Sequence, residues 1–110
     1  MNVYDKAYEL ANAIRQLPEY KAFKEAYQKI NENEQNKKML EDFRKKQLEI
    51  KAKELSGEKV DPKEKEILEK LWEILNLNPE LSSYLSLEYT LGKIMDDILK
   101  IIMEPMEVNR

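Results

Sequence analysis

The last long apolar segment, Asn78 to Met103, constrains the fold more than any other stretch of the chain. It begins with Asn78-Pro79, a good N-cap followed by a proline suited to the first helical position, and it contains no further proline. At about 100° per residue, its apolar side chains cover roughly half of a helix circumference. An arc this wide is more than one neighbouring helix can cover. The residues on this face are Leu81, Tyr84, Leu85, Leu87, Leu91, Ile94, Met95, Ile98, Leu99, Ile101 and Ile102.

The rest of the chain also favours helices. Charged residues make up 37% of the 110 residues, against a usual ~25%, and only two glycines and four prolines interrupt them. We therefore predict an all-α fold: about five helices in an elongated antiparallel bundle, with long third and fifth helices. Residues 1–106 are expected to form a single helical domain, and residues 107–110 a disordered tail.

Capping residues and prolines mark the helix limits. A polar run at 31–36 is expected to be a break, with Asn33 able to cap the following helix and Gly57 able to end it. Asp61, Pro62 and Glu64 resemble a capping box. The expected helices are Val3–Gln16, Pro18–Asn31, the segment after the break to Ser56, Pro62–Leu77 and the segment that follows Asn78. The fourth is expected to bury Ile67, Leu68, Leu71, Trp72, Ile74 and Leu75.

Several kinds of chemistry are excluded or disfavoured. The chain has no cysteine and no histidine, which removes thiolate chemistry, the commonest general base and the commonest transition-metal ligand. Glu66, Glu69 and Glu73 are spaced for one helix face, but this face lies opposite Ile67 and is expected to be solvated. We expect no cofactor, no metal and no enzymatic activity. The N-terminus lacks a signal-peptide pattern and no apolar run is long enough to span a membrane, so a cytoplasmic protein is expected.

The third helix has two apolar stripes, and each is expected to contact a different neighbour. One stripe contains Met39, Leu40, Phe43 and Ile50, and the other contains Leu48, Ala52 and Leu55. Together with the wide arc of the fifth helix, the second stripe predicts a homodimer. The candidate interface residues are Leu48, Ala52, Leu55, Leu91, Ile94, Ile98 and Ile101.

Glu88 is the one charge within the broad apolar face of the fifth helix. A buried carboxylate without a partner is costly, so we expect it to be paired. Our hypothesis is that Glu88 meets Arg44 or Gln47, within the chain or across a dimer, and so sets the register of the helices. A catalytic role for Glu88 is the weaker alternative. Gly92, one turn further on, is expected to mark a close helix approach.

The lysines of the third helix suggest a second function. Lys38, Lys45 and Lys46 could contact RNA, but acidic residues interrupt the basic run. Glu49 precedes Lys53 by four positions, a spacing that favours an ion pair on the helix surface. A solvent-exposed helix surface with ion pairs therefore explains the lysines without nucleic acid. Direct RNA binding remains the alternative function.

Four segments resemble the YlbF/YmcA-like family, and its YheA-like branch most closely. They are Val3-Tyr4-Asp5-Lys6-Ala7-Tyr8-Glu9-Leu10, Phe43-Arg44-Lys45-Lys46-Gln47, Ser56-Gly57-Glu58 and Lys100-Ile101-Ile102-Met103-Glu104-Pro105. Their order and spacing extend the similarity over nearly the whole chain.

The resemblance implies a small, all-helical, cytoplasmic protein that is often dimeric and not an enzyme. It also implies a regulatory or adaptor role with a protein partner complex. Better-understood branches act in development, competence and biofilm formation, and are linked to an mRNA-processing endonuclease. Some of those branches carry cysteines that hold iron–sulfur clusters, a property that does not transfer to a chain without cysteine.

Overall fold

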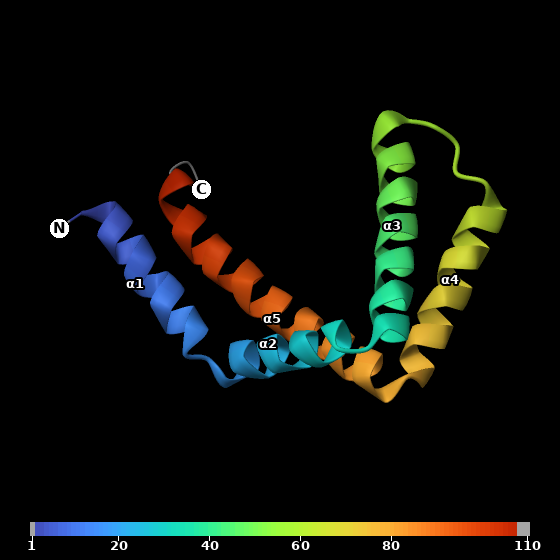
Figure 1. Cartoon of the computed structure of the whole chain (residues 1–110). Coiled ribbons are helices and arrows are strands. Elements are labelled where there is room, and N and C mark those ends of the chain that lie inside the picture. Colours follow the sequence, from blue (N-terminus) through green and yellow to red (C-terminus); the bar gives the residue numbers. More distant parts are fainter. Residues whose placement is uncertain (1, 108–110) are drawn as a thin grey trace. The chain divides into compact units, whose positions relative to one another are not determined.

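The computed structural model describes residues 2–107 and contains five α-helices and one short 3-10 helix, with no strand in this range (Figure 1). The prediction of an all-α protein with about five helices, the third and fifth being the longest, is confirmed. Residues 108–110, most of the expected tail, lie outside the described residues. The elements are α1 (Val3–Arg15), α2 (Pro18–Asn31), α3 (Glu34–Ser56), α4 (Pro62–Leu77), α5 (Pro79–Met103) and η1 (Glu104–Met106).

Local capping explains where the helices begin and end. The side chains of Asn33 and Asn78 accept hydrogen bonds from the first turns of α3 and α5, as their positions in the sequence predict. Gly57 ends α3 in the left-handed conformation, with φ of 81°, which a glycine adopts at little cost. The break before α3 is shorter than expected, because the helix begins at Glu34 and includes Gln35 and Asn36.

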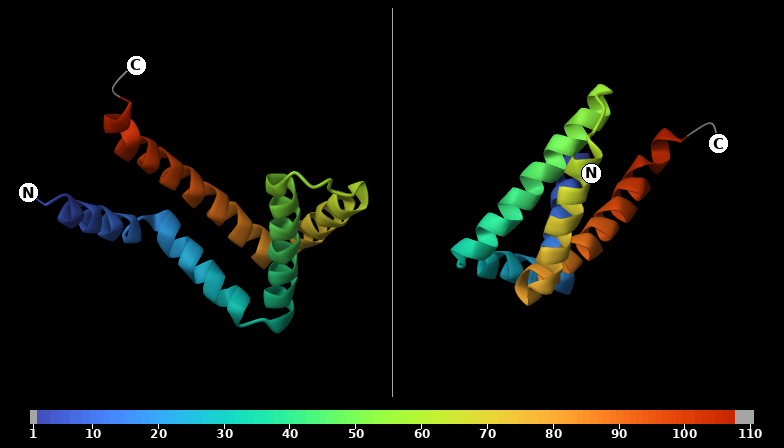
Figure 2. Two further views of the ribbon diagram at one scale, coloured as in Figure 1. Left: turned by 90° about the horizontal axis from the view of Figure 1, so that it is seen from above. Right: turned by 90° about the vertical axis from the view of Figure 1, so that its right-hand side faces the viewer.

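The chain divides into two compact units. One, which we call the hairpin unit, comprises residues 27–83, and the other, which we call the terminal arm, comprises the described residues 2–26 and 84–107. Within the hairpin unit, α3 and α4 lie side by side and run antiparallel (Figures 1 and 2). Its buried apolar side chains are Ile30, Leu40, Phe43, Ile50, Leu75 and Leu81.

Burial on α3 follows the sequence pattern, but burial on α4 does not. Of the expected α4 core, Leu75 is buried, whereas Ile67, Trp72 and Ile74 remain 48%, 44% and 50% exposed. Trp72 still contacts the core through Phe43, at 5.8 Å between ring centroids. The prediction of a fully buried α4 face was therefore wrong, because α3 covers only the side of α4 that carries Leu75.

Two local expectations also differ from the structure. Glu64 does not complete a capping box with Asp61, because its Oε1 accepts a 2.8 Å hydrogen bond from Lys53 and its Oε2 is buried without a partner among the described residues. Gly92 is not a point of close helix approach within the described chain, since a Cβ added there would meet no atom within 4 Å. The helix α5 continues through Gly92.

Candidate functional site: an apolar cleft in the terminal arm

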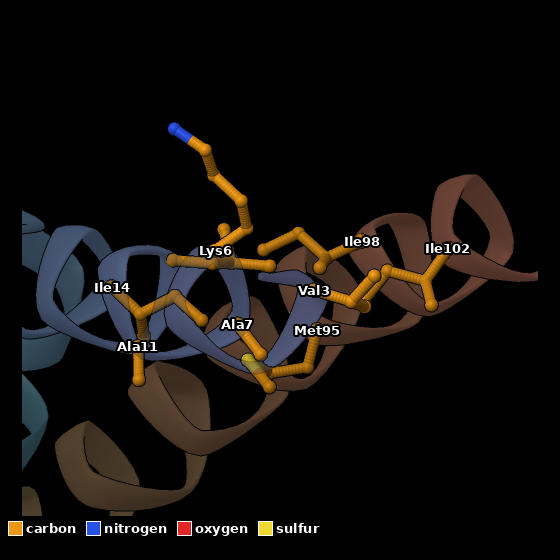
Figure 3. Close-up of a pocket in the computed structure, with 9 residues that line it drawn as sticks. Val3, Lys6, Ala7, Ala11, Ile14, Met95, Ile98 and Ile102 are labelled. Atoms are coloured by element: carbon orange, nitrogen blue, oxygen red, sulfur yellow. The ribbon is translucent and has the colours of Figure 1, made fainter. Parts of the chain in front are cut away.

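Within the terminal arm, α1 and the C-terminal part of α5 run antiparallel and line an open apolar cleft of about 400 Å³ (Figures 1 and 3). Asn2 caps α1 by accepting a 2.8 Å hydrogen bond from Tyr4 N, which places the first apolar residue, Val3, in the first turn. The lining residues recur at helical spacing on both helices. They are Val3, Lys6, Ala7, Leu10, Ala11, Ile14, Met95, Ile98 and Ile102.

The cleft has almost no polar character. Lys6 is its one charged lining residue, and Figure 3 shows the lysine side chain extending away from the other lining residues. The Lys6 ammonium instead forms a 3.1 Å ion pair with Glu9 on the outer surface of α1. A site without convergent polar groups can bury apolar surface, but it offers no acid, base or nucleophile to a reaction.

The helices of the terminal arm leave much apolar surface exposed. No residue of α1 is buried. Of the wide apolar arc of α5, Met95, Ile98 and Ile102 line the cleft. Leu99 and Ile101, on either side of them, are 57% and 62% exposed. The expectation that one neighbour cannot cover this arc is therefore confirmed for the described residues. The large exposed apolar residues of the arm include Val3, Tyr4, Tyr8, Met95, Leu99, Ile101, Ile102, Met103 and Met106.

Aromatic and polar contacts order the inner end of the terminal arm. The rings of Phe23 and Tyr84 stack at 5.2 Å between centroids, and the Tyr84 hydroxyl donates a 3.3 Å hydrogen bond to Glu88 Oε2. Glu88 is half-buried. The tyrosine contact was not predicted, although its i, i+4 spacing was available in the sequence.

The expected partners of Glu88 lie in the hairpin unit. There, Arg44 Nη1 donates a 3.2 Å hydrogen bond to Gln47 Oε1 on the same helix. The pairing of Glu88 with either residue stays a prediction.

The second stripe of α3 lies on the surface of the hairpin unit. Leu48 and Leu55 are 68% and 80% exposed, and Ala52 is exposed with them. The other candidate interface residues lie in the arm, where Leu91, Ile94 and Ile98 are half-buried and Ile101 is exposed. Both predicted stripes are thus accessible within their own units.

The lysines proposed for RNA differ in their surroundings. Lys38 and Lys45 are exposed on α3, whereas Lys46 is partly buried and lies 3.8 Å from Glu49. Lys53 does not form the ion pair with Glu49 that the spacing in the sequence predicts, because its Nζ lies 2.8 Å from Oε1 of Glu64 on α4. That hydrogen bond raises the pKa of Lys53 above its usual 10.5, and desolvation only partly opposes it.

A buried asparagine is the polar feature that sequence reasoning missed. Asn36 is 6% exposed, and its amide donates to Glu80 Oε2 at 3.0 Å while accepting from Asn78 Nδ2 at 2.8 Å. Its backbone N–H donates to the cap residue Asn33. This cluster joins the first turn of α3 to the turn between α4 and α5. Its position within a polar run made Asn36 resemble a loop residue.

Neither a metal site nor a membrane span is found in residues 2–107. No group of three or more acidic side chains is placed to hold a metal ion there, and Glu66 instead lies 3.4 Å from Lys70. No helix of this part of the chain combines the length and apolar character needed to cross a bilayer.

Comparison with known proteins defines the family. A model of the YlbF/YmcA family, described as control of the competence regulator ComK, matches residues 3–107, and the chain belongs to this family. The family is thus regulatory by its description. A UPF0342 protein of Caldicellulosiruptor saccharolyticus is 48% identical over 97% of this chain and 89% of its own length. A UPF0342 protein of Clostridium tetani is 38% identical over 99% of this chain and 94% of its own length.

Solved structures agree with this membership. A protein of unknown function (DUF964) from Bacillus stearothermophilus has a TM-score of 0.85 and 26% identity, over 96% of this chain and 92% of the other. YheA from Bacillus subtilis has a TM-score of 0.73 and 27% identity, with both chains fully covered. Bacillus subtilis RicA, solved in complex with RicF, shares the fold with a TM-score of 0.62 at 20% identity, over 94% of this chain and 92% of the RicA chain.

Proposed function

We propose that this protein is a non-enzymatic regulatory adaptor that works in the cytoplasm through protein–protein contacts. The observation that carries the proposal is the apolar cleft of the terminal arm, which is lined by aliphatic side chains and holds no convergent polar groups. Family membership supports a regulatory role. The solved complex of RicA with RicF is consistent with a fold that assembles with protein partners.

Self-association is the first such contact. We infer a homodimer that uses the exposed stripes of α3 and α5, because large apolar side chains in contact with water favour association. Leu48 and Leu55 on α3, and Ile101 on α5, have more than half of their surface exposed. A regulatory partner would then bind the assembled dimer.

Light scattering of the full chain tests this function. A dimer at tens of micromolar supports it, and a monomer throughout that range contradicts self-association. Replacing both Leu48 and Leu55 with lysine tests the α3 stripe. Replacing the exposed Glu41 and Lys45 with alanine on the same helix gives a control that removes charge and leaves the apolar stripe intact.

We also propose that Glu88 fixes helix register by pairing with Arg44 or Gln47. Its support is the half-buried position of Glu88 and the hydrogen bond that it accepts from the Tyr84 hydroxyl, because this carboxylate is then not freely solvated. A double-mutant cycle of Glu88→Gln with Arg44→Met, and a second with Gln47→Leu, measures the coupling in unfolding free energy. Coupling above about 0.5 kcal/mol in one cycle supports the pairing, and additivity in both contradicts it.

RNA binding through α3 is the alternative function. The exposure of Lys38 and Lys45 is the observation that favours it. Under this alternative, affinity for single-stranded RNA falls steeply with salt and is lost on reversing Lys38, Lys45 and Lys46 to glutamate. Binding that is absent at low salt, or unchanged by the three substitutions, eliminates it.

A further inference from the structure

We propose that the cleft of the terminal arm is filled by the terminal arm of a second copy of this chain, so that four helices close around one apolar core. This inference rests on the proposed self-association and adds to it a contact in which α1 and α5 of each copy pack together. It also gives α1 a role in assembly.

The first argument is that the buried residues of the arm, Tyr84 and Leu85, lie on α5, whereas α1 contributes none. None of the 13 residues of α1 is buried, although Val3, Ala7, Leu10, Ala11 and Ile14 form a continuous apolar stripe. An isolated helix of this length is marginal in water, and helices in proteins gain most of their stability from packing an apolar face. The face of α1 is directed at a cleft that no other described part of the arm fills.

The second argument is the amount of apolar surface. The large side chains exposed on the arm range from 43% exposure at Met95 to 79% at Val3. With about 200 Å² for a free side chain of this size, they leave on the order of 1,000 Å² of mainly apolar surface in water. A stable protein interface of standard size buries about 800 Å² on each partner. The arm therefore carries the surface that one dimer interface requires.

The third argument is self-complementarity. The small side chains of Ala7 and Ala11 leave room in the cleft, while Leu99 and Ile101 project from the flanks of α5. A two-fold dimer places the projecting residues of each copy against the hollow of the other, and two pairs of antiparallel helices form the familiar four-helix arrangement. An apolar lining whose one lysine extends outward disfavours RNA or a charged peptide as the occupant.

A matched pair of alanine substitutions tests the proposal. Ala7 lines the cleft, whereas Ala13 is exposed on the same helix and does not line it. In sedimentation equilibrium, Ala7→Glu should raise the dimer dissociation constant by on the order of 100-fold or more, because it buries a carboxylate in each half of an apolar interface. Ala13→Glu adds the same charge to the same helix and should leave the constant within about threefold.

The outcomes separate this inference from the proposed function. A wild-type protein that stays monomeric overturns both. A dimer that resists Ala7→Glu but dissociates when Leu48 and Leu55 become lysine overturns the arm interface and leaves self-association standing. Equal weakening by Ala7→Glu and Ala13→Glu also overturns the arm interface. Circular dichroism confirms that each variant is still helical.

Thiol protection gives an independent test that tolerates any folding defect of the charged variant. Because the chain has no cysteine, Ala7→Cys and Ala13→Cys each introduce a single thiol. The thiol at position 7 should react with a maleimide at least tenfold more slowly when the protein is raised from monomeric to dimeric concentrations, and the thiol at position 13 should not change. An unprotected position 7 in the dimer, or equal protection of both positions, would overturn the proposal.

Discussion

The side-chain amide of Asn78 donates a 2.8 Å hydrogen bond to Asn36 Oδ1, joining the turn before α5 to the first turn of α3. Asn36 in turn donates to Glu80, and the Asn78 side chain also caps α5. Each partner is thereby held in the geometry that the other needs. A buried polar group of this kind allows one register between α3 and the α4–α5 turn, because a shifted register would leave it unsatisfied.

Asn36→Ala should lower the unfolding free energy by about 1–3 kcal/mol, because it leaves the amide of Asn78 and the carboxylate of Glu80 without their partner. Urea unfolding followed by the fluorescence of the single tryptophan, Trp72, measures this change in the hairpin unit. Gln35→Ala is the matched control, since Gln35 is exposed one position earlier on α3, and its effect should stay within about 0.5 kcal/mol. Equal effects of the two substitutions would show that the cluster contributes nothing specific.

The ion pair between Lys53 and Glu64 should make stability depend on pH at the alkaline end. The pKa of Lys53 is raised above its unfolded value of 10.5, so its contribution is complete below that pH and is lost as pH rises through the folded-state pKa. Wild type and Lys53→Met should therefore differ in Tm by a constant amount from neutral pH to about pH 10 and converge above it. The exposed Lys51→Met is the control. A difference that persists to about pH 12 would contradict the role of the pair.

Gly57→Ala should destabilise the hairpin unit by about 1 kcal/mol, because residue 57 has φ of 81° and a Cβ disfavours the left-handed conformation. Space is not the cause, since a Cβ at this position meets no atom within 4 Å. Gly57→Asn should restore part of the loss, as asparagine tolerates this conformation better than alanine. Thermal unfolding of the three proteins gives the comparison, and an alanine variant as stable as wild type would contradict it.

Gly92→Ala should have the opposite effect. Residue 92 lies inside α5 with no atom near the position of a Cβ, so alanine should stabilise the helix by about 0.5–1 kcal/mol through its higher helix propensity. The change is measured by chemical unfolding at a protein concentration low enough to keep the chain monomeric. Destabilisation under these conditions would show that a neighbour approaches Gly92 closely.

Local signals in the sequence predicted the helices well. Asn33, Gly57, Asp61 and Asn78 act within one turn of their own positions, so their identities suffice to place the helix ends. Apolar spacing likewise identified the buried stripe of α3, which includes Leu40, Phe43 and Ile50. These features depend on short-range geometry that a single sequence contains.

Long-range features were harder to predict because they depend on which neighbour covers each face. The α4 stripe that contains Ile67 and Ile74 has the spacing of a core face, yet α3 covers only the side with Leu75. Asn36 occurs in a polar run typical of a loop, and only its partners 42 and 44 positions away explain its burial. The excess width of the apolar arc on α5 was predictable, but its cleft with α1 was not.

Amide hydrogen exchange of α1 tests the central claim most directly, because α1 has no buried residue within its own chain. If the arm of a second copy covers α1, protection of the amides at residues 6–15 should rise with protein concentration in step with dimer formation. Protection of the core of the hairpin unit, such as the amides around Phe43, should already be present in the monomer. Amides of α1 that are fully protected in the monomer, or that exchange freely in the dimer, would contradict the claim.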